Sequence, residues 1–187
     1  MTKRELLLES ALKLFTENGF HGTATSKIAK EAGVSNGTLF NNFSTKDELV
    51  LELYLAIKNE VSQKMKEHLT EVEKDPKLAL KKQIFNAIYW AIDNPNKLNY
   101  LQQFHFSPYV NLLTEDINSR SLIPHLSLIQ EAVDNGVINN IDPDFVYALL
   151  GNHVSGVYQY IQSKDFSSDE VNQIVNTSSE LFWKMIT

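Results

Sequence analysis

The apolar residues of this chain recur with the period of an α-helix along most of its length. Near the start, one apolar face predicts a helix over residues 2–18, which Gly19 ends. That face consists of Leu7, Ala11, Leu14 and Phe15. No stretch alternates apolar and polar residues as a half-buried strand does. The pattern therefore predicts an all-α protein of about nine helices.

The next two predicted helices are short and are joined by a tight turn. They cover residues 25–32 and 35–43, and Ser35 is placed to cap the second of them. Gly33 lies between them and can adopt the left-handed conformation that reverses the chain. Ala29 is small where the two helices must cross closely. This is the pattern of a helix-turn-helix, and it predicts a three-helix domain over residues 1–45.

Residues 46–187 are predicted to form a larger helical domain. A long helix runs from Lys46 to about residue 70, and further helices are predicted at 78–92, 96–106, 119–135, 143–164 and 168–187. Asp75-Pro76, Asp142-Pro143, and Ser167 or Ser168 have the form of helix caps. Pro124 must lie in the first turn of its helix or kink it. The last two helices are expected to form a hairpin.

Composition limits the class of protein. Of the 187 residues, 43% are hydrophobic and 21% are charged, as in ordinary globular proteins, and the absence of cysteine excludes disulfides and thiolate metal sites. No run of about 18 apolar residues occurs. We therefore expect a cytoplasmic protein without a membrane partner. The net charge is −6, but the first fifty residues carry equal numbers of acidic and basic side chains. A DNA contact there would be modest in affinity and sensitive to salt.

The first fifty residues resemble the DNA-binding domain of the TetR family of transcriptional repressors. The resemblance lies in the ordered spacing of nineteen residues: Ala11, Leu14, Phe15, Gly19, Phe20, Thr23, Thr25, Ile28, Ala29, Ala32, Gly33, Val34, Ser35, Gly37, Thr38, Leu39, Phe43, Lys46 and Leu49. It covers about a quarter of the chain, and the rest is compatible with the family in length and helical pattern.

The resemblance implies roles in DNA binding for individual residues. The candidates are Thr25, Ser26, Lys27, Ser35, Asn36, Gly37, Thr38, Phe40, Asn41, Asn42 and Lys46. Thr25 or Ser26 is expected to cap the first helix of the pair, over residues 25–32. The candidates at the start of this helix would contact phosphates, and so would Lys46. Asn36 to Thr38 and Asn41 would meet base edges. Family members often have lysine at position 36 and tyrosine at position 40, so Asn36 and Phe40 remove two common backbone contacts.

An enzyme is the competing interpretation of the same turn. Residues 33–37 fit the G-x-S-x-G pattern of a hydrolase nucleophile elbow, but that elbow needs a strand before the serine, and here the preceding residues have helical spacing. The five histidines share no metal-ligand spacing, and no phosphate-binding loop occurs. We infer no catalysis, no cofactor and no metal.

The predicted terminal hairpin carries two kinds of face. One face is bulky and the other has small residues, which allows packing within the protomer and close packing against a second copy. The residues predicted at the homodimer interface are Ala148, Gly151, Ser155, Gln159, Ile174, Ser178, Leu181 and Phe182. Two ordinary helices in a monomeric bundle are the alternative.

Aromatic residues concentrate in the middle of the chain, where family members bind inducers. The predicted ligand-binding residues are Tyr89, Trp90, Phe104, His105, Tyr109, His125 and His153. An apolar cleft with a few polar groups is the usual form of such a site. The alternative, which is favoured for any single ring, is that the rings simply fill the core.

These patterns predict a ligand-responsive transcriptional regulator. It would bind double-stranded, palindromic operator DNA as a homodimer, act as a repressor, and be released by a small-molecule effector of unknown identity. The alternative is a helical small-molecule-binding or interaction protein without specific DNA binding.

Overall fold

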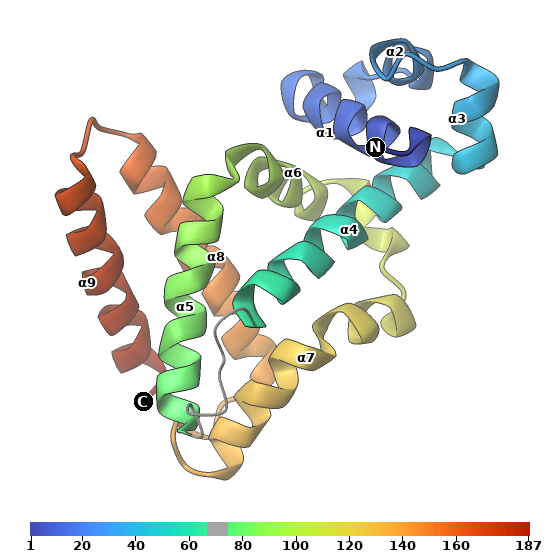
Figure 1. The fold of residues 1–187 in the computed structure, drawn as a ribbon. Coiled ribbons are helices and arrows are strands. Elements are labelled where there is room, and N and C mark those ends of the chain that lie inside the picture. The colour runs from blue at the N-terminus through green and yellow to red at the C-terminus, as the bar shows by residue number, and fades with distance from the viewer. Residues whose placement is uncertain (67–74) are drawn as a thin grey trace. The chain divides into compact units, whose positions relative to one another are not determined.

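The computed structural model describes residues 1–66 and 75–187, and within them all side chains except those of residues 66, 76, 115, 116 and 118–125. This part of the chain forms nine α-helices, one 3-10 helix and no strand (Figure 1), which confirms the all-α prediction. The helices are α1 (Lys3–Gly22), α2 (Thr25–Glu31), α3 (Asn36–Asn42), α4 (Lys46–Lys66), α5 (Pro76–Asp93), α6 (Pro95–His105), η1 (Pro108–Leu112), α7 (Glu115–Asp134), α8 (Pro143–Gln162) and α9 (Ser168–Ile186).

The helices group into two compact units. The first unit comprises Met1–Asn59 and Pro95–Ser119, and the second comprises Glu60–Asn94 and Arg120–Thr187. In the first unit α1 packs against α2, α3 and α6, and α2 packs against α3. In the second unit α5 packs against α8 and α9, and α8 packs against α9. The predicted hairpin of the last two helices is therefore confirmed.

Helix α1 is interrupted where the sequence places its end. Gly19 has φ +70°, a conformation that side chains disfavour, and one further turn follows it. This break turns Phe20 back against the helix, so that its ring centroid lies 5.2 Å from that of Phe15. Both rings are buried, as are Leu7 and Ala11 on the same face. The apolar stripe of the N-terminal helix thus forms the core of the first unit.

Most helix starts follow their predicted caps. The carboxylates of Asp75 and Asp142 accept hydrogen bonds from the backbone amides of the first turns of α5 and α8, and Ser167 forms a reciprocal capping box with Glu170 in α9. Thr45 caps α4 in the same manner, by accepting from the backbone N–H of Glu48 at 3.0 Å. Because each cap acts within a few residues of sequence, it could be predicted before the packing was known.

Two predicted helix starts are wrong. Helix α2 has Ala24 as its N-cap, with no side-chain cap, so neither Thr25 nor Ser26 has the predicted capping role. Helix α7 begins at Glu115 instead of residue 119, because the hydroxyl of Thr114 accepts a hydrogen bond of 3.4 Å from the backbone N–H of Ile117. Pro124 therefore lies within this helix and not in its first turn. The predicted end of the long helix, near residue 70, lies outside the described residues.

Candidate functional site

The turn between α2 and α3 is a Schellman motif. Gly33, with φ +67°, donates from its backbone N–H to the carbonyl of Lys30 at 3.1 Å, and Val34 donates to the carbonyl of Ala29 at 2.9 Å. These two bonds satisfy carbonyls that would otherwise be exposed at the end of α2. The motif fixes the direction in which the chain leaves α2 and hence the placement of α3.

Ser35 fixes the start of α3. Its hydroxyl oxygen accepts a hydrogen bond from the backbone N–H of Thr38 at 3.1 Å, and the two hydroxyl oxygens lie 3.0 Å apart. The predicted cap is confirmed. The residues before Ser35 form α2 and its turn instead of a strand, so the serine lacks the setting of a hydrolase nucleophile elbow.

Apolar side chains hold the two short helices in place. Ile28 and Leu39 are fully buried and Ala29 is 2% exposed, and α2 and α3 both pack on α1. Phe43, directly after α3, is also fully buried. With these residues turned inward, one side of α3 is left to solvent.

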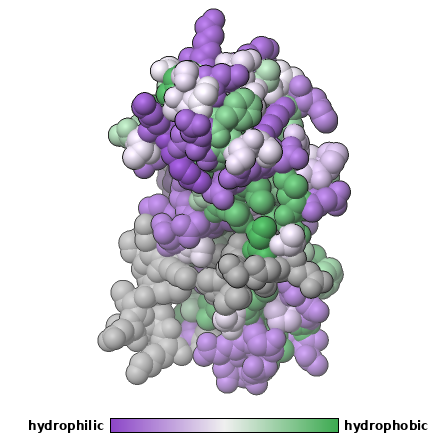
Figure 2. Space-filling model, turned by 90° about the vertical axis from the view of Figure 1, so that its right-hand side faces the viewer, coloured by the Kyte–Doolittle hydropathy of each residue, from purple (hydrophilic) through white to green (hydrophobic). Residues whose placement is uncertain are grey.

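The solvent side of α3 carries short polar residues. Asn36, Gly37 and Asn41 are exposed, Thr38 is half-buried, and the ring of Phe40 is 44% exposed. Figure 2 shows the side of the molecule on which α3 lies in Figure 1, and hydrophilic side chains predominate in its upper part. Such a surface can meet the edges of bases in a major groove.

Besides Ser35 and Thr38, the candidates Asn42 in α3 and Lys46 in α4 have side-chain hydrogen bonds within the protein. The Nδ2 atom of Asn42 donates to the carbonyl of Thr38 at 2.8 Å, so this amide supports the helix. The Nζ atom of Lys46 donates to the carbonyl of Phe20 at 2.5 Å and lies 5.9 Å from the centre of the Phe15 ring. Partial burial lowers the pKa of Lys46. A phosphate contact by Lys46 would have to use the remaining ammonium protons.

The charge around the turn is locally positive. Glu31 is the only acidic residue between Gly22 and Lys46, and its carboxylate lies 2.6 Å from the Nζ atom of Lys13, whose pKa this contact raises. Lys27 and Lys30 are exposed on α2. Helix α2 lacks a side-chain cap, so no capping side chain accepts hydrogen bonds from the backbone amides at its start. Such amides can bind an anion.

A short supporting helix, a fixed turn and an exposed polar second helix define a helix-turn-helix DNA-binding protein. Residues 7–53 match the family model described as bacterial regulatory proteins, tetR family. The uncharacterized HTH-type transcriptional regulator YhgD of Bacillus subtilis is 25% identical over 166 residues, which cover 84% of each chain. The chain belongs to the TetR family of DNA-binding transcriptional regulators.

Solved structures match along nearly the whole chain. A crystal structure assigned to the tetR family, from Shewanella sp. PV-4, has a TM-score of 0.86 and 28% identity and covers 100% of this chain and 98% of that one. The regulator FadR of Bacillus subtilis, crystallised with stearoyl-CoA, has a TM-score of 0.76 and 21% identity and covers 98% of this chain and 99% of that one. The FadR likeness is one of fold.

The predicted ligand-binding residues fall in both units. Phe104, His105 and Tyr109 belong to the first unit, where Phe104 stacks on Tyr54 at 4.1 Å between ring centroids and Tyr109 lies 4.9 Å from Phe20. Phe104 is fully buried. Of the three, only Phe104 is part of the core of the first unit, because Tyr109 is half-buried and His105 is exposed.

The remaining predicted ligand-binding residues belong to the second unit. Trp90 is 7% exposed and donates from Nε1 to the carboxylate of Glu60 at 3.2 Å, while the hydroxyl of Tyr89 donates to the side chain of Asn172. The ring of His153 lies 5.0 Å from that of Phe182. The side chain of His125 lies outside the described residues.

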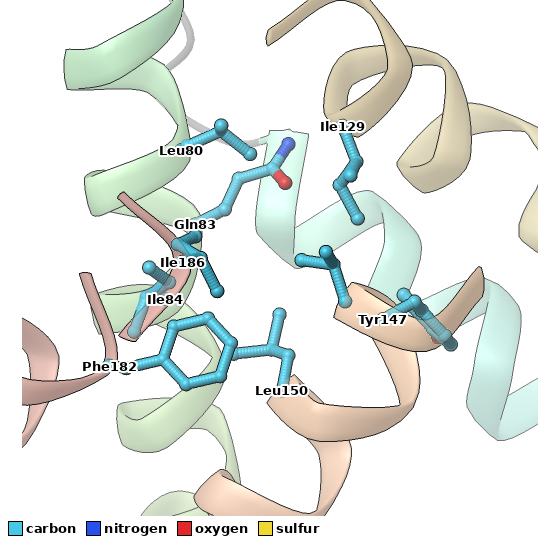
Figure 3. Close-up of a pocket in the computed structure, with 9 residues that line it drawn as sticks. Leu80, Gln83, Ile84, Ile129, Tyr147, Leu150, Phe182 and Ile186 are labelled. Carbon is cyan, nitrogen blue, oxygen red and sulfur yellow. The ribbon is translucent and has the colours of Figure 1, made fainter. Parts of the chain in front are cut away.

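The second unit contains a small apolar cavity that the sequence did not predict (Figure 3). It is lined by Leu80, Gln83 and Ile84 of α5, Ile129 of α7, Val146, Tyr147 and Leu150 of α8, and Phe182 and Ile186 of α9. None of the predicted ligand-binding residues lines it. Its apolar residues read as ordinary helix faces in the sequence, so only their convergence from four helices reveals it.

The predicted dimer interface is partly corrected. Ser178 and Phe182 are 8% and 2% exposed, because they face the core of their own unit, and so they cannot form a free surface. Ala148, Gly151 and Gln159 on α8 are exposed, as is Leu181 on α9, while Ser155 and Ile174 are half-buried. The exposed large apolar residues of these two helices that the prediction missed are Phe145, Tyr160 and Met185.

Proposed function

We propose that this regulator is a ligand-responsive repressor that binds a palindromic operator as a homodimer. Residues 1–45 would form the DNA-binding domain, and residues 46–187 would bind the effector and form the dimer. The observation that carries the proposal is the construction of α3. A Schellman turn and the Ser35 cap fix this helix while its short polar side chains face solvent.

The base contacts proposed for α3 follow from side-chain chemistry. An asparagine amide can pair with adenine through two hydrogen bonds, which suits the exposed Asn36 and Asn41. The methyl group of Thr38 can meet that of thymine, and Gly37 allows close approach of the backbone. Thr25, Ser26 and Lys27 at the uncapped start of α2 would contact phosphates.

The proposed dimer uses the exposed faces of α8 and α9. Phe145 and Tyr160 on α8 and Leu181 and Met185 on α9 are each about half exposed or more, at 56%, 48%, 59% and 51%. Large exposed apolar side chains on two helices that pack against each other support a protein interface. A two-fold dimer would present its α3 helices to DNA about one helical turn apart, or a multiple of it.

The proposed release mechanism is a shift between two conformations. An effector bound in the larger domain would favour the conformation in which the two α3 helices no longer match both half-sites. It can do so only to the extent that it binds the two conformations with different affinity. Helix α4 begins directly after the DNA-binding domain. We propose that a tilt of α4 distinguishes the two conformations.

Mobility-shift titration with DNA from upstream of its own gene tests DNA recognition. Thr38→Ala is expected to weaken specific binding about fivefold or more, because a base contact contributes about 1–3 kcal/mol. Thr177→Ala is the matched control, since Thr177 is an exposed threonine of α9. Unchanged binding by Thr38→Ala would remove Thr38 from the reading surface, and the absence of binding to any duplex at low salt would overturn the proposal.

Light scattering after size-exclusion chromatography tests the dimer. Leu181→Glu is expected to yield monomers, because it places a charge in the apolar interface. Phe106→Glu is the control: Phe106 lies in the first unit and is even more exposed, at 91% against 59% for Leu181. Equal masses for the wild type and Leu181→Glu would contradict this interface.

A further inference from the structure

Helix α3 carries no charged side chain. Its sequence is NGTLFNN, with neither a basic nor an acidic residue. In a major groove, arginine or lysine is the commonest reader of guanine, and a carboxylate can accept from the amino group of cytosine. Arg4, the only arginine of the first fifty residues, forms an ion pair with Glu52 and lies 5.0 Å from the ring centre of Phe43. The charged groups that most often recognise a G·C pair are therefore missing from α3.

The polar groups that α3 does offer suit A·T pairs. Asn36 and Asn41 are exposed, and a side-chain amide can donate to N7 of adenine and accept from its amino group. The amide of Asn42 already donates to the carbonyl of Thr38. The hydroxyl of Thr38 lies 3.0 Å from that of the cap residue Ser35, so its methyl group is the part best suited to a base, and it matches the methyl group of thymine.

Phe40 is the large apolar side chain on the exposed side of α3. Leu39 and Phe43 are fully buried, whereas the ring of Phe40 is 44% exposed. A single exposed ring is common on protein surfaces, so the argument depends on its place. Phe40 follows Asn36 by four residues, which makes the two side chains neighbours on the helix. The apolar group that base pairs present in the major groove is the 5-methyl group of thymine, and a phenylalanine ring can contact it.

The length of α3 limits how many base pairs it can read. Its seven residues span about 10 Å, which is the length of about three base pairs. Asn36 and Phe40 are about 6 Å apart along the helix axis, or about two base-pair steps. The amide and the ring can therefore meet bases within the same short segment of a half-site.

We propose that α3 reads a core of about three A·T pairs in each half-site, and that Phe40 is a specificity-determining residue that contacts the methyl group of a thymine in this core. The inference rests on the proposed operator binding and names the class of sequence that the operator contains. Because the methyl contact involves no phosphate, the preference for thymine is independent of salt, although the affinity itself falls as salt is added.

Selection of duplexes from a random library by the full chain is the first part of the test. The selected half-sites are expected to share an A·T core. Each core thymine is then replaced singly by uracil, which pairs in the same way and lacks only the 5-methyl group. At one thymine the replacement is expected to weaken wild-type binding about fourfold, as the loss of one buried methyl group allows. Fluorescence anisotropy at two salt concentrations measures this ratio, which is expected to be the same at both.

Variants assign the preference for thymine to one side chain. Phe40→Ala is expected to bind the thymine and uracil duplexes equally at that position, and Phe40→Leu to keep part of the preference, because leucine is apolar. Thr38→Ser removes the other methyl group, retains the hydroxyl beside Ser35, and is expected to leave the preference unchanged. Phe106→Ala is the matched control, since Phe106 is 91% exposed and lies directly after α6.

Three results would overturn the inference: a G·C core in the selected half-sites, a wild type that does not distinguish thymine from uracil at any core position, or a full preference for thymine in Phe40→Ala. Each of these requires tight binding to a selected duplex and so leaves the proposed DNA recognition intact. If no duplex is selected even at low salt, the proposed function itself fails. Far-UV circular dichroism checks that Phe40→Ala is folded, and Phe40→Leu carries the comparison if it is not.

Discussion

The hydroxyl group of Tyr100 in α6 donates a hydrogen bond of 2.7 Å to the main-chain carbonyl of Val50 in α4. The side chain of Tyr100 is fully buried, and its ring centroid lies 6.2 Å from that of Phe15 and 5.6 Å from that of Phe20. A helix that follows α5 in sequence is therefore part of the core beneath the DNA-binding helices. A change in the position of α6 would act directly on α1 and α4.

Tyr100→Phe tests the strength of this link. The ring would stay in place while the hydrogen bond is lost, so the free energy of unfolding is expected to fall by about 1 kcal/mol. Urea unfolding followed by circular dichroism measures the change. Tyr89→Phe removes the hydroxyl that donates to Asn172 near the surface and is expected to cost less. An equal or larger loss in Tyr89→Phe would contradict the role given to Tyr100.

The cap of α3 gives a second prediction. Ser35→Ala removes the acceptor for the backbone N–H of Thr38 and is expected to destabilise the protein by about 1 kcal/mol. Ser35→Asn should retain most of the stability, because asparagine is an equally good cap. Urea midpoints of the three proteins provide the measurement. Equal midpoints for Ser35→Ala and the wild type would show that the cap contributes nothing.

Two glycine substitutions should have opposite effects. Gly33→Ala places a side chain at φ +67° and is expected to cost about 1–2 kcal/mol, although no neighbouring atom would clash with the new methyl group. Gly156→Ala adds a methyl group in open space on α8 and is expected to stabilise by about 0.5–1 kcal/mol, because alanine favours the helix. Thermal unfolding of both variants measures the difference. Destabilisation of the same size in both would mean that the conformation of Gly33 is not the cause.

Asn36→Lys should change the salt dependence of DNA binding. The new charge at the start of α3 can reach a phosphate and release about one counterion, so the slope of log K against log salt is expected to become steeper by about 0.9. Mobility-shift titrations at several salt concentrations measure the slope. Asn176→Lys, on α9, is the control and should leave the slope unchanged. If Asn36→Lys has the same slope as the wild type, residue 36 does not lie near the DNA backbone.

Tyr147 gives a pH-dependent prediction for the second unit. Its pKa is raised by burial to about 12, above the value of about 10 for a free tyrosine. The folded state thus favours the neutral phenol, and this contribution to stability is complete below about pH 10 and is lost as the pH rises toward 12. Urea unfolding between these pH values should show a smaller decrease in Tyr147→Phe than in the wild type. Identical pH profiles would mean that Tyr147 is not buried in solution.

Local chemistry made much of this protein predictable from its sequence. The caps at Ser35, Asp75, Asp142 and Ser167 and the turn at Gly33 each depend on atoms within a few residues of one another. The helix-turn-helix combines such local signals with a fixed spacing, so it could be identified before any packing was known. Where a local signal was ambiguous, as at Thr25 and Thr114, the predicted helix start was wrong.

Only the tertiary structure decided which helix faces meet. Periodicity shows that residues share a face, but it does not show what that face packs against, because burial depends on helices distant in the sequence. Ser178 and Phe182 are buried within their own unit instead of lying on a free face, and Phe104 is buried against Tyr54. The apolar cavity of the second unit belongs to the same class, since four helices must converge to form it.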